Sequence, residues 1–214
     1  MIEQNLHKIT SQIPLGVTLV AVSKTKPNSQ IMEAYNAGQR VFGENKVQDM
    51  AAKAALLPKD ISWHMIGHLQ TNKVKYIASF VSLIHGIDSL KLLKEVNKRA
   101  AQNNRVIDCL LQLHIAQEET KFGLTTNEAK EVLNASIDLE NIRITGVMGM
   151  ASNTSNENQV GDEFRSLKEL ALNLNKTMPL ITIVSMGMSN DYLTAIKAGS
   201  TMVRVGSAIF GKRN

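Results

Sequence analysis

Cysteine and aromatic residues are scarce in this sequence, and each scarcity limits how the fold can be stabilised. The single cysteine, Cys109, excludes a disulfide within the chain and is typical of a reducing compartment. It lies in the apolar run 106–111, which favours a buried structural thiol over a nucleophile. Aromatic residues make up only 4% of the chain against 43% hydrophobic residues, so we expect an aliphatic core of strands covered by helices.

Long apolar runs and long basic runs are also absent. No segment approaches the roughly 20 apolar residues that span a bilayer, and the N-terminus lacks a signal-peptide pattern, so we expect a cytoplasmic protein. The net charge is +5, which could serve nucleic-acid or anionic membrane binding. However, no basic run is longer than Lys212 and Arg213. The dispersed charge favours a basic protein without such a partner.

One pattern repeats along the chain: a β-branched apolar run, a loop and a longer helical stretch. We predict strands at 19–23, 40–43, 63–66, 83–85, 107–114, 144–148, 181–185 and 202–205. Such alternation implies parallel strands with right-handed crossovers, and eight strands close a barrel. We therefore predict an α/β protein with a single (β/α)₈ TIM-barrel domain over residues 1–214. An open doubly wound sheet is the alternative, but the first strand is not followed by a G-x-G-x-x-G motif.

Polar and glycine residues also indicate where the helices begin and end. Helices are expected at 3–13, 29–37, 90–103, 127–136 and 190–198, with a long helix that ends before Pro179. The expected N-caps are Asn28, Ser89, Thr126, Asn156 and Ser189, and the expected terminating glycines are Gly38 and Gly199.

Ligand sites of both architectures form at the carboxyl ends of the strands, where Lys24 follows a fully apolar strand. Burial at the barrel mouth would lower the pKa of its amine, as imine formation with an aldehyde requires. The alternative is a lysine that only extends to solvent, and Lys26 is expected to be such a residue. Asn45 and His64 also end strands and can line the same mouth.

The turns after the last two predicted strands favour a phosphate site. Gly187 permits close approach of an anion, Ser189 is expected at a helix start, and Gly206 with Ser207 forms a second small turn rich in donors. Tight turns and a simple helix cap are the alternative. Arg204 precedes the second turn and, if buried, needs a ligand ring nitrogen or a carboxylate as partner. Glu44 and Asp191 are the candidate carboxylates.

The other histidines point to no catalytic or metal site. His64 and His68 are four residues apart on a strand end and a loop, so a metal pair is not expected. His85 and His114 are expected to be structural groups.

Several blocks together resemble the pyridoxal phosphate (PLP) homeostasis protein family, in the family's order along nearly the whole chain. They are AVSKTKP (21–27), FGEN (42–45), WHMIGHLQTNK (63–73), KFG (121–123), GVMGM (146–150), SMGMSND (185–191) and VRVGSAIFG (203–211). The resemblance implies a PLP-binding barrel of fold type III, similar to the barrel domain of alanine racemase.

The resemblance also implies a role for each site residue. Lys24 would carry PLP as a Schiff base, an internal aldimine, and Arg204 would face the pyridine nitrogen. The phosphate would bind Ser189 and the Gly206–Ser207 amides, where Ser207 replaces the commoner threonine but keeps the hydroxyl. The remaining cofactor contacts would be Asn45, Met148 and Ser185.

Members of this family are implicated in control of free PLP and vitamin B6, without firmly attached catalysis. A cation beside the pyridine nitrogen disfavours its protonation and weakens the electron sink, although racemases of this fold manage with such an arginine. Those racemases also use a tyrosine from an additional β-domain. In this chain Tyr35 and Tyr192 fall in predicted helices, and Tyr76 falls in the helical stretch expected between two predicted strands. We therefore expect a monomeric PLP carrier that passes PLP to apo-enzymes. The alternatives are a weak amino-acid racemase and a Schiff-base aldolase.

Overall fold

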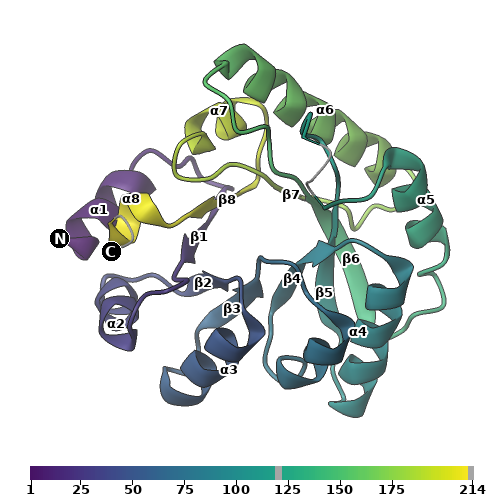
Figure 1. Ribbon diagram of the computed structural model, residues 1–214, viewed down its shortest axis with the longest axis horizontal. Coiled ribbons are helices and arrows are strands. Elements are labelled where there is room, and N and C mark those ends of the chain that lie inside the picture. Colours follow the sequence, from purple (N-terminus) through teal and green to yellow (C-terminus); the bar gives the residue numbers. More distant parts are fainter. Residues whose placement is uncertain (119–121, 212–214) are drawn as a thin grey trace.

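The strands close into a ring. The computed structural model describes residues 1–118 and 122–211, and in this part eight parallel strands pair in chain order to form a closed barrel (Figure 1). They are β1 (Thr18–Val22), β2 (Val41–Glu44), β3 (Ser62–Met65), β4 (Leu83–Ile87), β5 (Ile107–Gln112), β6 (Ile142–Met148), β7 (Ile183–Ser185) and β8 (Met202–Val205). The ring closes because β1 pairs with β8, with Val20 opposite Arg204. This confirms the predicted (β/α)₈ barrel and excludes the open sheet.

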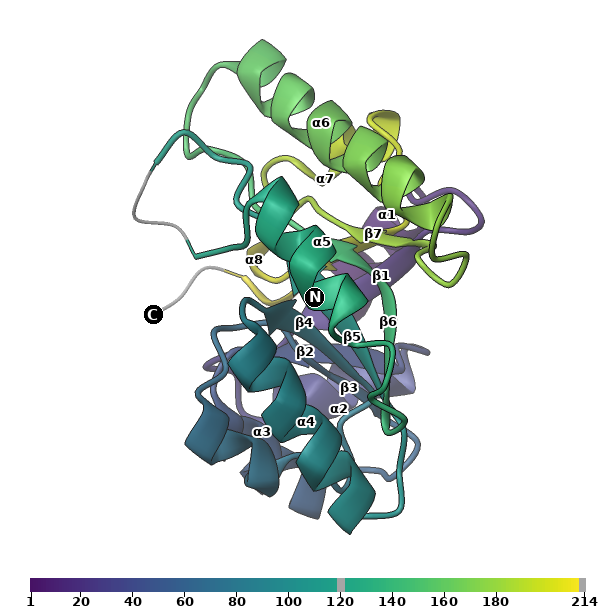
Figure 2. The ribbon, with the colours of Figure 1, turned by 90° about the vertical axis from the view of Figure 1, so that its right-hand side faces the viewer.

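Helices surround the strands (Figure 1), and α6, α5 and α4 follow one another downward on the flank that faces the viewer in Figure 2. They are α1 (Ile2–Thr10), α2 (Asn28–Asn36), α3 (Val47–Leu56), the 3₁₀ helix η1 (Thr71–Tyr76), α4 (Leu90–Gln102), α5 (Thr126–Asn134), α6 (Glu157–Asn175), α7 (Tyr192–Lys197) and α8 (Ser207–Phe210). The predicted ranges did not include α3, η1 and α8. None of these three has a side-chain cap, and η1 and α8 are short.

Two predicted caps are confirmed. Ser89 accepts a hydrogen bond from the Leu92 amide, and Asn156 accepts one from the Gln159 amide. For α5 the predicted Thr126 is wrong by one position. The preceding residue, Thr125, is the cap, and it forms a capping box with Glu128.

The other two predicted caps are wrong. Asn28 is the first residue of α2, whose cap position is Pro27, and no side chain caps this helix. Ser189 lies in the loop before α7, which begins only at Tyr192. The predicted glycines do follow their helices in the left-handed region, with φ of 99° at Gly38 and 91° at Gly199.

The core has two layers. A large aliphatic layer lies between the strands and the helices, as expected from the composition. A smaller apolar cluster consists of Val20, Leu83, Leu110, Met148 and Met202. Because side chains alternate along a strand, the residues two positions from these also face the barrel interior. The polar side chains of the interior occupy such positions.

The interface between β6 and β7 sets a steric limit that can be tested. A Cβ added to Gly146 would come within 2.0 Å of the Ile183 carbonyl oxygen, so the strands would have to separate. We expect Gly146→Ala to lower the free energy of unfolding by about 3 kcal/mol, measured by chemical denaturation.

Gly161→Ala in α6 is the matched control. Its added Cβ would meet only the flexible end of Arg165, and alanine favours a helix by about 1 kcal/mol over glycine. Equal stability of the two variants would contradict the steric argument.

Candidate functional site

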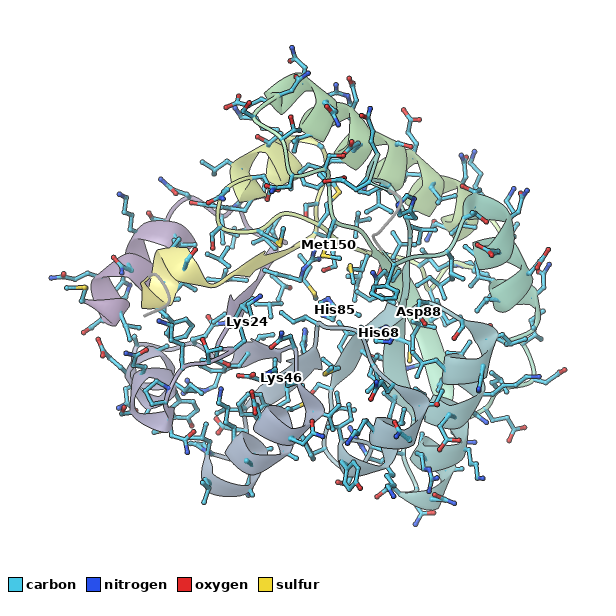
Figure 3. The ribbon with its side chains drawn as sticks, in the orientation of Figure 1. Lys24, Lys46, His68, His85, Asp88 and Met150 are labelled. Carbon is cyan, nitrogen blue, oxygen red and sulfur yellow. The ribbon has the colours of Figure 1, made fainter. Side chains whose placement is uncertain are left out.

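Lys24 stands at the carboxyl end of β1. The alternation from Val20 through Val22 directs it toward the barrel interior, and its side chain is half-buried. Figure 3 shows Lys24 on the β1 side of the barrel opening, with His85 near its middle and His68 on the far side. The position agrees with the sequence prediction.

The turn that carries Lys24 is strained. The Lys26 amide donates to the Ser23 carbonyl at 3.0 Å, and Thr25 inside this turn has φ of 65°. A β-branched residue rarely adopts this conformation, which costs on the order of 1–3 kcal/mol. Lys26 Nζ also donates to the Phe210 carbonyl at 3.0 Å. Lys26 is therefore half-buried, and the prediction that it is a solvated loop residue is wrong.

A buried ion pair supports the same turn from outside the barrel. Ser23 Oγ donates to Glu44 at 2.6 Å, and Lys53 Nζ donates to the same carboxylate oxygen at 2.7 Å. Lys53 also donates to the Ser23 carbonyl at 2.9 Å. Glu44 alternates to the outer face of β2, so it cannot serve Arg204 as proposed from the sequence. Lys53 was not predicted from the sequence, because it lies in α3, which the predicted helix ranges did not include.

Arg204 is buried inside the barrel, 4% exposed. Nη1 donates to Ser185 Oγ at 2.6 Å and Nη2 to the Gly149 carbonyl at 3.0 Å. Burial lowers the pKa of the guanidinium to about 10, and the charge of Asp191 opposes this shift. Arg204 therefore stays a cation at neutral pH. Its direct partners are a hydroxyl and a carbonyl, and Asp191 acts on it through charge.

Two histidines extend this contact across the interior. His85 Nδ1 lies 3.0 Å from Ser185 Oγ, and His85 Nε2 lies 3.1 Å from His64 Nδ1. His64 Nε2 is 3.4 Å from Ser62 Oγ. Burial lowers the pKa of His64 to about 4, and burial with the nearby His64 and Arg204 lowers the pKa of His85 well below its ordinary value. Both imidazoles are neutral at pH 7.

Sequence reasoning missed this chain of contacts. It placed His64 at the mouth and treated His85 as a separate structural group. The alternation of side chains along a strand could have indicated it. Ser62 and His64 lie four and two positions before Ile66, and His85 lies two positions after Leu83, and both apolar residues face the barrel interior.

The turns after β7 and β8 meet, as predicted. The Gly206 amide donates to Ser189 Oγ at 3.1 Å, so Ser189 links the two turns rather than capping α7. Gly187 has φ of 93°, and a Cβ there would lie 2.5 Å from the Ala195 side chain. Ser207 is exposed, and no hydrogen bond within the described residues uses its amide.

Strand pairing brings the remaining predicted residues to the same interior. Met148 is 1% exposed in the inner apolar cluster and is paired with Ser185 across β6 and β7. Asn45 follows β2, and its backbone lies so close to Gly67 that a Cβ on Gly67 would be 2.5 Å from the Asn45 carbonyl. Lys121 and the basic pair Lys212 and Arg213 lie outside the described residues.

A second polar group lies at the opening, opposite Lys24 (Figure 3). His68 Nδ1 is 3.1 Å from an Asp88 carboxylate oxygen, and the His68 ring stacks on Phe122 with 4.7 Å between centroids. Sequence reasoning considered His68 only as a metal ligand.

Some site classes find no support in the described part of the chain. There, no group of three or more His, Cys, Asp or Glu side chains could hold a metal ion. No helix among these residues is long and apolar enough to cross a membrane. Cys109 is fully buried, and burial together with Asp108 raises the pKa of its thiol, which confirms the structural interpretation.

Comparison with known proteins identifies the family. Residues 1–214 match the family model described as alanine racemase, N-terminal domain. A pyridoxal phosphate homeostasis protein of Aquifex aeolicus is 42% identical over 197 residues, which are 91% of this chain and 86% of the relative. The chain belongs to the pyridoxal phosphate homeostasis protein family. This confirms the resemblance seen in the sequence blocks.

Solved structures agree with this membership. PipY of Synechococcus elongatus PCC7942, solved without and with PLP bound, is 34% identical and superposes with TM-scores of 0.94 and 0.91 over 99% of this chain and 100% of that chain. Alanine racemase of Clostridium difficile shares the fold with a TM-score of 0.80 at 12% identity, over 99% of this chain and 60% of the racemase chain.

The low pKa of His64 predicts a pH dependence of stability. The unfolded state binds a proton near pH 6.5, whereas folded His64 resists it until about pH 4. The free energy of unfolding therefore falls with decreasing pH in this window, by up to about 1.4 kcal/mol per pH unit for this residue. We expect His64→Asn to reduce this slope by one proton, measured by urea denaturation across the window.

Ile84→Val on the same strand as His85 is the control. It removes one buried methyl group and lowers stability by about 1 kcal/mol at every pH, so its slope should match the wild type. An unchanged slope in His64→Asn would contradict the proposed neutral, buried imidazole.

Proposed function

We propose that this chain binds PLP through Lys24 and takes part in PLP homeostasis as a carrier rather than a catalyst. The observation that carries the proposal is the placement of Lys24 and Arg204. Lys24 follows β1 and Arg204 lies in β8, the neighbouring strand that pairs with β1, and both are directed into the interior. PipY, of the same fold and 34% identical, is known with PLP bound.

The donor set fits the cofactor. Ser189, Gly206 and Ser207 form adjoining small turns that would hold the phosphate. Arg204 would donate to the ring nitrogen. The sides of the ring would contact Asn45, Met148 and Ser185.

The chemistry of attachment needs only Lys24. PLP, when bound, supplies an aldehyde and an electron-withdrawing pyridine ring. The Lys24 amine would form a C=N bond to the aldehyde carbon and release its oxygen as water. The turn holds Lys24 in place for this bond, since the preceding Ser23 is bound to Glu44 and to Lys53.

The tyrosines support a carrier. The Tyr35 hydroxyl donates to Asp60 on the outer side of α2, and the Tyr192 hydroxyl donates to Gln12. Tyr76 is 51% exposed in η1. The hydroxyls of Tyr35 and Tyr192 are thus occupied by other side chains, and Tyr76 is exposed on a surface helix, which supports a carrier over a racemase with a tyrosine as second acid–base group.

Lys24→Ala should abolish the visible absorbance that wild-type protein gains on addition of PLP. Lys26→Ala, in the same turn, is the matched control and should retain the absorbance. Borohydride reduction followed by peptide mass spectrometry should place PLP on Lys24. Equal absorbance in Lys24→Ala and the wild type would contradict the attachment site, and trapping of a sugar phosphate instead of PLP would favour an aldolase.

The carrier role predicts transfer without turnover. PLP-loaded protein should restore activity to the apo form of a PLP-dependent enzyme. Amino acids incubated with it in deuterium oxide should keep their α-protons, measured by proton NMR. Exchange of an α-proton that is lost in Lys24→Ala would instead support the racemase alternative.

We also propose that the protein is a cytoplasmic monomer. The single buried cysteine supports a reducing compartment. Light scattering of the purified protein tests the oligomeric state.

A further inference from the structure

The interior hydrogen-bond chain has a direction, and Arg204 sets it. A guanidinium has only donors, so Arg204 must donate to Ser185 Oγ. The Ser185 hydroxyl proton is then free to be donated to His85 Nδ1 at 3.0 Å. His85 consequently carries its proton on Nε2 and donates it to His64 Nδ1, so His64 also carries its proton on Nε2, toward Ser62.

The reverse direction is disfavoured for two reasons. If His85 Nδ1 donated to Ser185, the Ser185 hydroxyl proton would have no acceptor among the described residues in a fully buried position. In addition, the N–H dipole of each histidine in this series of hydrogen bonds would then turn its positive end toward the Arg204 cation. The forward direction turns every negative end toward this cation, and low-dielectric surroundings strengthen the preference.

We propose that Ser185, His85 and His64 are positioning residues that hold Arg204 in place as a hydrogen-bond donor toward the cofactor ring. The inference rests on the proposed PLP binding and deepens it. With the Ser185 proton committed to His85, the Ser185 oxygen stays turned toward Arg204 and holds the guanidinium as a fixed cation and donor beside the ring nitrogen. The site then selects an unprotonated ring nitrogen, which leaves the electron sink weak.

The charged and titratable groups around His85 are few. His64 on β3 lies on one side, and Arg204 on β8 lies beyond Ser185 on the other. Asp191 acts on Arg204 through its charge. These groups come from different strands, so the direction of the hydrogen bonds between them depends on barrel closure.

The direction can be measured without a cofactor. In ¹⁵N-histidine-labelled wild-type protein, two-bond ¹H–¹⁵N correlation spectra distinguish the tautomers, with assignments from His64→Asn and His85→Asn. We expect the Nε2–H tautomer at both residues at neutral pH. An Nδ1–H tautomer at either residue overturns the proposed chain.

The effect on the ring is measured with PLP labelled with ¹⁵N in the pyridine ring. We expect an unprotonated ring nitrogen in the wild type. His85→Leu removes the acceptor of the Ser185 proton, so the hydroxyl can reorient and no longer holds Arg204 as a fixed donor toward the ring. The pH of ring protonation should then rise by at least one unit, which is a tenfold change in proton affinity.

His85→Asn is the matched control. Its side chain has nearly the shape of leucine, but its carbonyl oxygen replaces Nδ1 as acceptor, so the ring should titrate as in the wild type. Identical titration of the leucine and asparagine variants overturns the positioning role. Failure of the wild type to bind PLP would reject the proposed function, whereas the tautomers of the cofactor-free protein would still decide the direction of the chain.

Discussion

The cation of Arg204, enclosed by a closed ring of strands, is the constraint on which the interior depends. Arginine does not lose its proton when buried, so every neighbour has to offer an acceptor. Gly149 offers a carbonyl and Ser185 a hydroxyl, and the hydroxyl in turn needs His85. Polar residues on three other strands, Ser185 on β7, His85 on β4 and His64 on β3, thus follow from one charge. An open sheet would leave these groups to water, so closure and the polar interior depend on each other.

A second charge network, outside the ring, determines where Lys24 stands. Glu44 is fully buried, and its Oε1 is held by Ser23 and Lys53, while Oε2 has no hydrogen-bond partner among the described residues. Removal of one partner from such a pair would leave a buried charge uncompensated, which is strongly destabilising. The pair therefore fixes Ser23, and the strained Thr25 conformation is tolerated next to it. Lys24 directly follows Ser23 and is therefore positioned by this outer network.

The fold could be predicted because its strands and most of its helices depend on local patterns. Strands follow from β-branched runs, and caps such as Ser89 follow from a polar residue before a helix. The pairing of His64 with His85 and of Glu44 with Lys53 could not be predicted, because it depends on which side chains meet after the barrel has closed. Ser189 shows that prediction from neighbouring residues can also fail. Its turn matched a cap, but the helix begins later and the hydroxyl serves Gly206 of the next turn.

The barrel shared with alanine racemase does not by itself imply the racemase's activity, because one fold can host many functions. The surroundings of the ring that we propose to bind determine its chemistry. A site in which a fixed cation donates to the ring nitrogen would hold an acceptor ring firmly and oppose its protonation. Protonation is the step that would make the ring an efficient electron sink. Firm binding of PLP and weak activation of its ring would therefore have the same physical origin, which is the buried Arg204 with the hydrogen bonds that hold it. This is the combination that a protein needs to hold a reactive aldehyde without consuming amino acids.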